Sequence, residues 1–179
     1  MMSSHTRSID YKGQSITIAT LERRADTAET VVFLHGLQTR KELFKPWLDQ
    51  PFLNDKSIFA IDFVGFGESE KPESFPYTVE AHAEVIVSTL DALDISTCHL
   101  IGHSLGGMVG TLLLEKIPER ILSLISMEGN LQEKDCGESA KVAGLAFDTF
   151  QKESFPALLD SLRSSDTPSA KFRLESVSQ

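Results

Sequence analysis

The sequence predicts an α/β fold built on a doubly wound, mostly parallel sheet. Two short apolar runs, Thr30 to Leu34 and Ser57 to Ile61, carry no charge and are rich in β-branched and aromatic residues, as strands buried on both faces are. Segments with the apolar spacing of helices separate such runs, and this alternation is typical of parallel sheets. A third observation is Ser104, which lies between glycines where an apolar run meets a helix-forming segment.

An antiparallel hairpin is expected at the start of the chain. Ser8 to Tyr11 and Gln14 to Glu22 alternate apolar and polar residues on either side of Lys12-Gly13, which has the composition of a tight turn. This hairpin would supply the first two strands of the sheet.

Three helices are expected between the later strands. The first covers Lys41 to Leu53 and gathers apolar residues on one face, although Pro46 would also suit a helix that begins there. The second covers Val79 to Leu93, with Thr78 as its N-cap, and the third covers Gly106 to Ile117.

Each buried strand is followed by a loop of glycines and polar residues. His35-Gly36-Leu37 follows the first apolar run, and residues 62–69 follow the second. We interpret Asp62 and the glycines after it as scaffolding of the second loop. Because open α/β sheets place their sites at the carboxyl ends of their strands, the functional site is expected among these loops.

The pentapeptide Gly102-His103-Ser104-Leu105-Gly106 has the context of a nucleophile elbow. A serine at so sharp a strand-to-helix turn needs a strained backbone, for which only flanking glycines leave room. Ser104 is therefore the candidate nucleophile. The backbone amide of Leu105, at the start of a helix, would donate a hydrogen bond to an oxyanion. The alternative is a glycine-rich turn with no catalytic role.

Three motifs in this order resemble those of the α/β-hydrolase superfamily. They are H-G-x from His35, D-x-x-G-x-G-x-S from Asp62 and G-H-S-x-G-G from Gly102, and the resemblance covers roughly Thr30 to Asn130. It implies a sheet of the α/β-hydrolase type, with Ser104 as a serine nucleophile.

The resemblance also implies an oxyanion hole and the residues that support it. The second oxyanion donor of the family comes from the loop after the third strand, so the matching group is the backbone amide of Leu37, beside that of Leu105. The resemblance also assigns the support of this site to His35, Gly36, Gly102 and Gly106.

The place of Glu128 in the sequence favours it as the catalytic acid. It follows the apolar run Ile121 to Met127, at the carboxyl end of a strand and before a turn. Some members of the superfamily, including those similar to haloalkane dehalogenases, carry an acid at this point. The alternative is that Glu128 caps the turn or binds Asn130, with the acid one strand later.

No histidine occupies the position of the family's base. In the superfamily the base follows the acid in the order Ser, Asp or Glu, His, and no histidine follows Ser104. We assign His103 to packing and His35 to support of its loop. Structural roles are expected for His82 and His99.

The length of the chain accounts for the missing base. Only 75 residues (179 minus 104) follow Ser104, too few for the last strands of the family's sheet and its histidine loop. We interpret the chain as the amino-terminal two-thirds of a hydrolase, with residues 1–130 in the core. Residues 131–179 would begin a helical cap, whose apolar stripe either lines a pocket or packs on the core. The polar segment Ser161 to Gln179 is expected to be disordered.

Composition narrows the expected partners and setting. The formal net charge of −9 and the pI near 5.0 argue against nucleic acid as a partner. No apolar run has membrane-spanning length, and Met1 to Asp10 lacks the apolar core of a signal peptide, so a cytoplasmic protein is expected. Cys98 and Cys136 are too few for a disulfide framework. No metal-ligand spacing is present, and no cofactor is implied.

The sequence therefore predicts a serine hydrolase that cleaves an ester or amide bond of a small or lipophilic acyl substrate through an acyl-enzyme on Ser104. Two alternatives are a lyase or cofactor-free haloperoxidase on the same fold, and a non-catalytic binding or regulatory module. Self-association is also expected, because a sheet that ends at Met127 would present an unpaired apolar edge.

Overall fold

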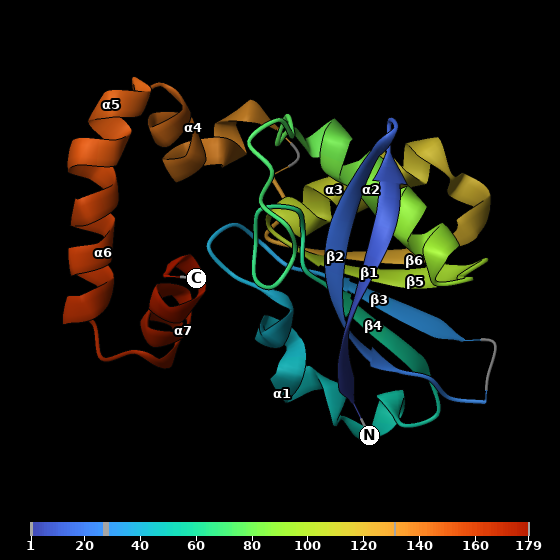
Figure 1. Cartoon of the computed structure of the whole chain (residues 1–179). Helices are drawn as coiled ribbons and strands as arrows, with labels where there is room; N and C mark the ends of the chain where they lie inside the picture. Colours follow the sequence, from blue (N-terminus) through green and yellow to red (C-terminus); the bar gives the residue numbers. More distant parts are fainter. Residues whose placement is uncertain (1, 27–28, 131, 179) are drawn as a thin grey trace. The chain divides into compact units, whose positions relative to one another are not determined.

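The computed structural model describes residues 2–26, 29–130 and 132–178, and the chain divides into two compact units (Figure 1). The first unit is Met1–Gly129 and the second is Asn130–Gln179. Leu131, where the cap segment was expected to begin, lies outside the described residues.

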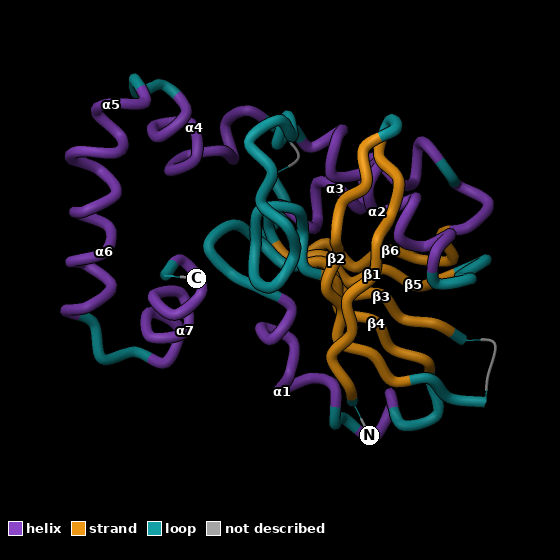
Figure 2. Tube along the Cα trace, in the orientation of Figure 1, coloured by secondary structure: helices purple, strands orange, loops and turns teal. Residues whose placement is uncertain are grey.

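A six-stranded sheet forms the first unit, in the order β1-β2-β4-β3-β5-β6 (Figure 2). The two strands of the amino-terminal hairpin pair antiparallel, and β2 pairs antiparallel with β4, whereas β3, β4, β5 and β6 run parallel. This mostly parallel sheet confirms the predicted fold class. The strands are β1 (Ser3–Tyr11), β2 (Gln14–Arg23), β3 (Thr30–Leu34), β4 (Ser57–Ile61), β5 (Cys98–His103) and β6 (Ile121–Met127).

Helices cover the two faces of the sheet and enclose separate apolar cores (Figure 1). On one face lie α2 (Val79–Ala92) and α3 (Leu105–Lys116), packed on residues of all six strands, including Phe59 and Ile61 of β4. Ile58 and Ala60 of β4 belong to the core on the other face. Thr78 caps α2 as predicted, since its side chain accepts a hydrogen bond from the Ala81 amide.

The helix predicted over Lys41 to Leu53 is instead three short segments on the opposite face of the sheet. They are the 3-10 turn η1 (Lys41–Phe44), α1 (Lys45–Leu48) and the 3-10 turn η2 (Pro51–Leu53). Pro46 and Pro51 each lie in the first turn of a new segment, because proline lacks the amide that would continue a helix. Phe44, Leu48 and Leu53 still reach the second core.

The β6 edge of the sheet differs from its interior. Within the part of the chain that the structure describes, β6 pairs only with β5. Leu122 and Ile125 are each 55% exposed. The edge on which self-association was predicted is therefore apolar and open in the first unit.

The second unit is helical. Leu162 of α6 (Phe155–Ser164) and Ala170 of α7 (Pro168–Val177) are buried, and these two helices pack against each other. The expected disorder of Ser161 to Gln179 was wrong, because α7 forms there with Thr167 accepting a hydrogen bond from the Ala170 amide. Its elements are η4 (Glu133–Cys136), α4 (Gly137–Ala143), α5 (Phe147–Thr149), the π-helical η5 (Phe150–Ser154), α6 (Phe155–Ser164) and α7 (Pro168–Val177). Among the described residues, no helix combines the length and apolar character needed to cross a membrane.

Candidate active site

Ser104 sits in a strained turn between β5 and α3. Its backbone has φ 52° and ψ −114°, in a region that residues with a side chain rarely adopt. The Ser104 amide donates to Met127 O at 2.8 Å, and the Ser104 carbonyl accepts from the Gly107 amide at 2.9 Å. Such strain persists only where surrounding structure enforces it, and it is concentrated at functional sites.

Close packing of backbone against backbone holds this turn. A Cβ atom on Gly106 would lie 2.0 Å from Leu34 O, and one on Gly102 would lie 2.3 Å from Gly106 O. Both distances are far below contact distance, so no other residue fits at either position. The first turn of α3 thereby rests directly on the ends of β3 and β5.

The loop after β3, residues 35–40, also packs against Ser104. A Cβ atom on Gly36 would lie 3.0 Å from Ser104 Cβ and 2.8 Å from His103 Nδ1. The backbone before Leu37 thus packs against the elbow. Leu105 is the first residue of α3, so its amide has no acceptor within the helix.

His35 supports the loop as a neutral ring. Its Nε2 accepts from the Phe63 amide at 3.1 Å, so Nδ1 carries the proton and donates to Gly36 O at 2.8 Å. Burial lowers the pKa of His35, although nearby Asp62 opposes the shift. The ring therefore has both nitrogens engaged and is not placed to take a proton from Ser104.

Glu128 lies beyond β6 with φ 53° and a side chain that is 85% exposed. Its Oε2 is 3.4 Å from His103 Nε2, whereas His103 Nδ1 is buried without a hydrogen-bond partner in the described structure. The packing role predicted for His103 does not include this contact with Glu128. The pair depends on the register of β5 and β6, which aligns His103 with Met127 and which no local sequence pattern reveals.

None of the five histidine rings hydrogen-bonds to the Ser104 hydroxyl within the described residues. His5 binds Ser3, and His99 binds Ser123 at 2.8 Å. His82 is buried among aromatic rings, as the structural role predicted for it requires.

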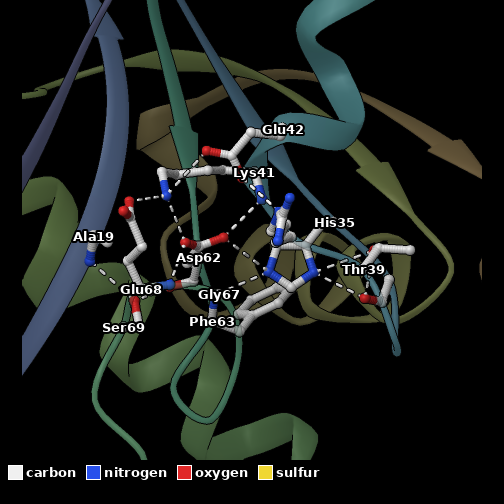
Figure 3. Close-up of polar contacts among 12 residues, drawn as sticks. Ala19, His35, Thr39, Lys41, Glu42, Asp62, Phe63, Gly67, Glu68 and Ser69 are labelled. Carbon is white, nitrogen blue, oxygen red and sulfur yellow. Dashed lines mark hydrogen bonds and ion pairs between the residues drawn. The ribbon is translucent and has the colours of Figure 1, made fainter. Parts of the chain in front are cut away.

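A buried ionic network connects the loop after β3 with the loop after β4, and the sequence did not predict it (Figure 3). Lys41, at the start of η1, has a fully buried side chain whose Nζ donates to Asp62 Oδ2 at 2.8 Å and to Glu68 Oε2 at 2.6 Å. Burial lowers the pKa of Lys41, but the hydrogen bonds to the two carboxylates outweigh burial and raise it overall. Asp62 was predicted to be scaffolding of its loop, whereas Lys41 was predicted only to begin a helix.

The family model for the alpha/beta hydrolase fold matches residues 29–179. The chain belongs to this family. The match includes Ser104, the loops after β3 and β4 and the whole second unit.

Several curated members of the α/β-hydrolase family are similar in sequence. A putative carbamate hydrolase, RutD, from Pantoea ananatis is 34% identical over 119 residues, which are 64% of this chain and 42% of that protein. A probable lysophospholipase, BODYGUARD 1, from Arabidopsis thaliana is 35% identical over 102 residues, 54% of this chain and 22% of that protein. The chain thus spans less than half the length of these relatives.

Solved α/β-hydrolase structures share the fold. A probable hydrolytic enzyme from Pseudomonas aeruginosa superposes with a TM-score of 0.79 at 20% identity, over 96% of this chain and 58% of the other. A haloalkane dehalogenase from Agrobacterium tumefaciens superposes with a TM-score of 0.71 at 20% identity, over 96% of this chain and 61% of the other. At these identities the likeness concerns the fold alone.

Proposed function

We propose that the chain carries the nucleophile and oxyanion hole of a serine hydrolase that cleaves an ester or amide bond of a small or lipophilic acyl substrate. The observation that supports this most is the strained backbone of Ser104, which packs against Gly36 and is followed by a helix start that rests on the end of β3 through Gly106. A strained serine that is followed by the unpaired amide of a helix start and packed against the loop after β3 is an arrangement suited to acyl transfer.

In the proposed reaction, Ser104 Oγ attacks the carbonyl carbon of the substrate, and its proton passes to a base. The carbonyl oxygen becomes an oxyanion, which accepts hydrogen bonds from the Leu37 and Leu105 amides. Collapse of this intermediate breaks the ester or amide bond, and the leaving group takes the proton. Water then attacks the acyl-enzyme by the same route and releases the acid.

Glu128 is proposed as the acid that orients the base. Its place after β6, beside the elbow, supports the role. Its carboxylate lies near His103 Nε2 and is otherwise open to solvent, so it is accessible to an imidazole that approaches from outside the described structure. The base itself is not identified among the five histidines of the chain.

The second unit is proposed to begin a helical cap over the substrate site, with residues 1–130 forming the core. The names of two relatives, a carbamate hydrolase and a lysophospholipase, support an ester or amide substrate. A cytoplasmic location and the lack of a nucleic-acid partner stay predictions.

One observation favours a second candidate function, a non-catalytic binding or regulatory module. No imidazole is hydrogen-bonded to Ser104 in the described residues, and a serine without its base retains little catalytic power. A lyase or haloperoxidase activity is not favoured by any feature of the site.

Labelling with a fluorophosphonate, followed by mass spectrometry of the modified peptide, tests the proposed function. We expect slow labelling confined to Ser104, loss of label in Ser104→Ala and unchanged labelling in Ser123→Ala, a control at an exposed serine of β6. A folded chain in which Ser104 never reacts would contradict the serine hydrolase and favour the binding module.

A further inference from the structure

Lys41 is an unusual residue to find in the interior of this protein. Its side chain is 0% exposed, and three carboxylates surround its Nζ, with Glu42 Oε1 at 3.2 Å in addition to Asp62 and Glu68 (Figure 3). Lysine is almost never fully buried unless it is paired, because removing an ammonium group from water is costly. Here two short hydrogen bonds compensate for that cost.

Asp62 binds Lys41 twice. Asp62 Oδ1 accepts from the Lys41 backbone amide at 2.6 Å, and Asp62 Oδ2 accepts from Lys41 Nζ at 2.8 Å. Oδ2 also accepts from the Glu68 amide at 3.0 Å. The carboxylate is itself fully buried, so its position depends on these donors.

The loop after β3 is consequently attached at both ends to the loop after β4. At its start, His35 accepts from the Phe63 amide, and at its end, Lys41 binds Asp62. Only residues 36–40 lie between these two attachments, and they include Gly36, which packs on Ser104. The backbone beside Ser104 thus takes its position from two consecutive residues of the β4 loop.

The β4 loop is anchored in turn to β2. The Asp62 amide donates to Ala19 O at 2.9 Å, and the Ala19 amide donates to Ser69 Oγ at 2.9 Å. Ser69 Oγ donates back to Asp62 O at 2.7 Å. Since β2 pairs with β4 only over Thr20 to Arg23, its earlier residues are free to hold this loop.

Gly67 completes the enclosure of the Asp62 carboxylate. Its φ is 51°, and a Cβ atom there would lie 2.2 Å from Asp62 Oδ2. The loop can therefore wrap around the carboxylate only with glycine at this position.

We propose that Lys41 is a positioning residue that holds the loop after β3 in the conformation in which the Leu37 amide faces the oxyanion. The proposal rests on the proposed function, because only a reaction at Ser104 gives that amide a role. Lys41 touches no substrate in this account. Its charge fixes Asp62, which holds the end of the loop.

Amide hydrogen exchange of the full chain tests the attachment without requiring activity. In Lys41→Met we expect exchange of residues 36–40 to accelerate by about tenfold or more, since a buried carboxylate loses its charged donor. Exchange in α2 and α3 should stay unchanged. Lys41→Arg, which retains the charge, should restore much of the protection.

Lys56→Met is the matched control. Lys56 also forms ion pairs, with Glu29 and Asp55, but it lies just before β4 at the opposite end of that strand from Asp62. Exchange of residues 36–40 should not change in this variant. If Lys41→Met does not fold, Glu68→Gln removes one carboxylate from Lys41 at a side chain that is 59% exposed, and it should raise exchange in the same five residues by a smaller factor.

The rate of fluorophosphonate labelling separates positioning from a purely structural role. We expect a fall of about tenfold or more for folded Lys41→Met, as for loss of an oxyanion donor, and none for Lys56→Met. Unchanged exchange at residues 36–40 in folded Lys41→Met or Glu68→Gln would overturn the positioning role. If Ser104 is unreactive in every variant while the exchange pattern holds, the proposed function fails and the attachment of the loop stands.

Discussion

The two flanks of Ser104 are built in different ways. On the flank formed by the loops after β3 and β4, His35, Lys41 and Asp62 are fully buried and bound through several hydrogen bonds. On the flank formed by β6, Glu128 is 85% exposed, and its Oε2 lies 3.4 Å from His103 Nε2. The flank proposed to stabilise negative charge is thus buried and extensively hydrogen-bonded, whereas the flank proposed to move a proton is open within the described residues.

Glycine packing under Ser104 gives the largest expected effect. Gly106→Ala should cost about 4 kcal/mol or more of the free energy of unfolding, because the new Cβ atom would collide with the Leu34 backbone. Gly144→Ala is the control: its nearest atoms would be 3.6 Å away, and its stability should change little. Urea unfolding measures both. Similar values for the two variants would contradict the close packing beneath the elbow.

Replacing a carboxylate by the matching amide on each flank tests the difference between the two flanks. Asp62→Asn should cost about 3 to 5 kcal/mol, because it leaves the buried Lys41 charge without its main partner. Glu128→Gln should change the free energy of unfolding by less than about 0.5 kcal/mol, since that carboxylate is exposed. Equal losses in urea unfolding would show that the two flanks are not as different as their burial indicates.

His82 should make the buried flank sensitive to acid. Burial, assisted by nearby His35, lowers the pKa of His82 from 6.5 to about 4. Between these values the unfolded chain binds a proton that the folded chain does not, so stability falls as the pH drops. The loss should be about 2 kcal/mol between pH 7 and pH 5.

The His82→Leu variant isolates this contribution. It should lose less stability than the parent chain over the same interval, and it should be close to the parent at pH 7, because His82 Nδ1 has no partner in the described structure. Identical pH dependence in urea unfolding would assign the acid sensitivity to other groups.

The open flank should also promote self-association through the β6 edge. Leu122→Lys and Ile125→Lys would each place a charge on that edge and should shift sedimentation towards the monomer. Thr6→Lys, at an exposed position of the opposite edge strand β1, should have no such effect. A parent chain that is already monomeric at every concentration would contradict this prediction.

The sequence alone was sufficient for features that depend on local patterns. Uncharged apolar runs predicted β3 and β4, and the glycines around Ser104 predicted its turn. Long-range pairs were not accessible in this way. Lys41 and Asp62 are 21 residues apart and meet only because β3 and β4 are parallel neighbours, so no spacing rule connects them. His103 and Glu128 depend similarly on the register of β5 and β6.

The pH dependence of fluorophosphonate labelling at Ser104 tests the contrast between the flanks most directly. If the chain supplies the oxyanion hole but no base, the rate should rise by about tenfold per pH unit between pH 6 and pH 9, as attack by the free alkoxide requires. A rate that reaches a plateau above a pKa near neutrality would contradict this, since it would show that a histidine of this chain already serves as the base, with His103, next to Ser104 in the sequence, as the first candidate.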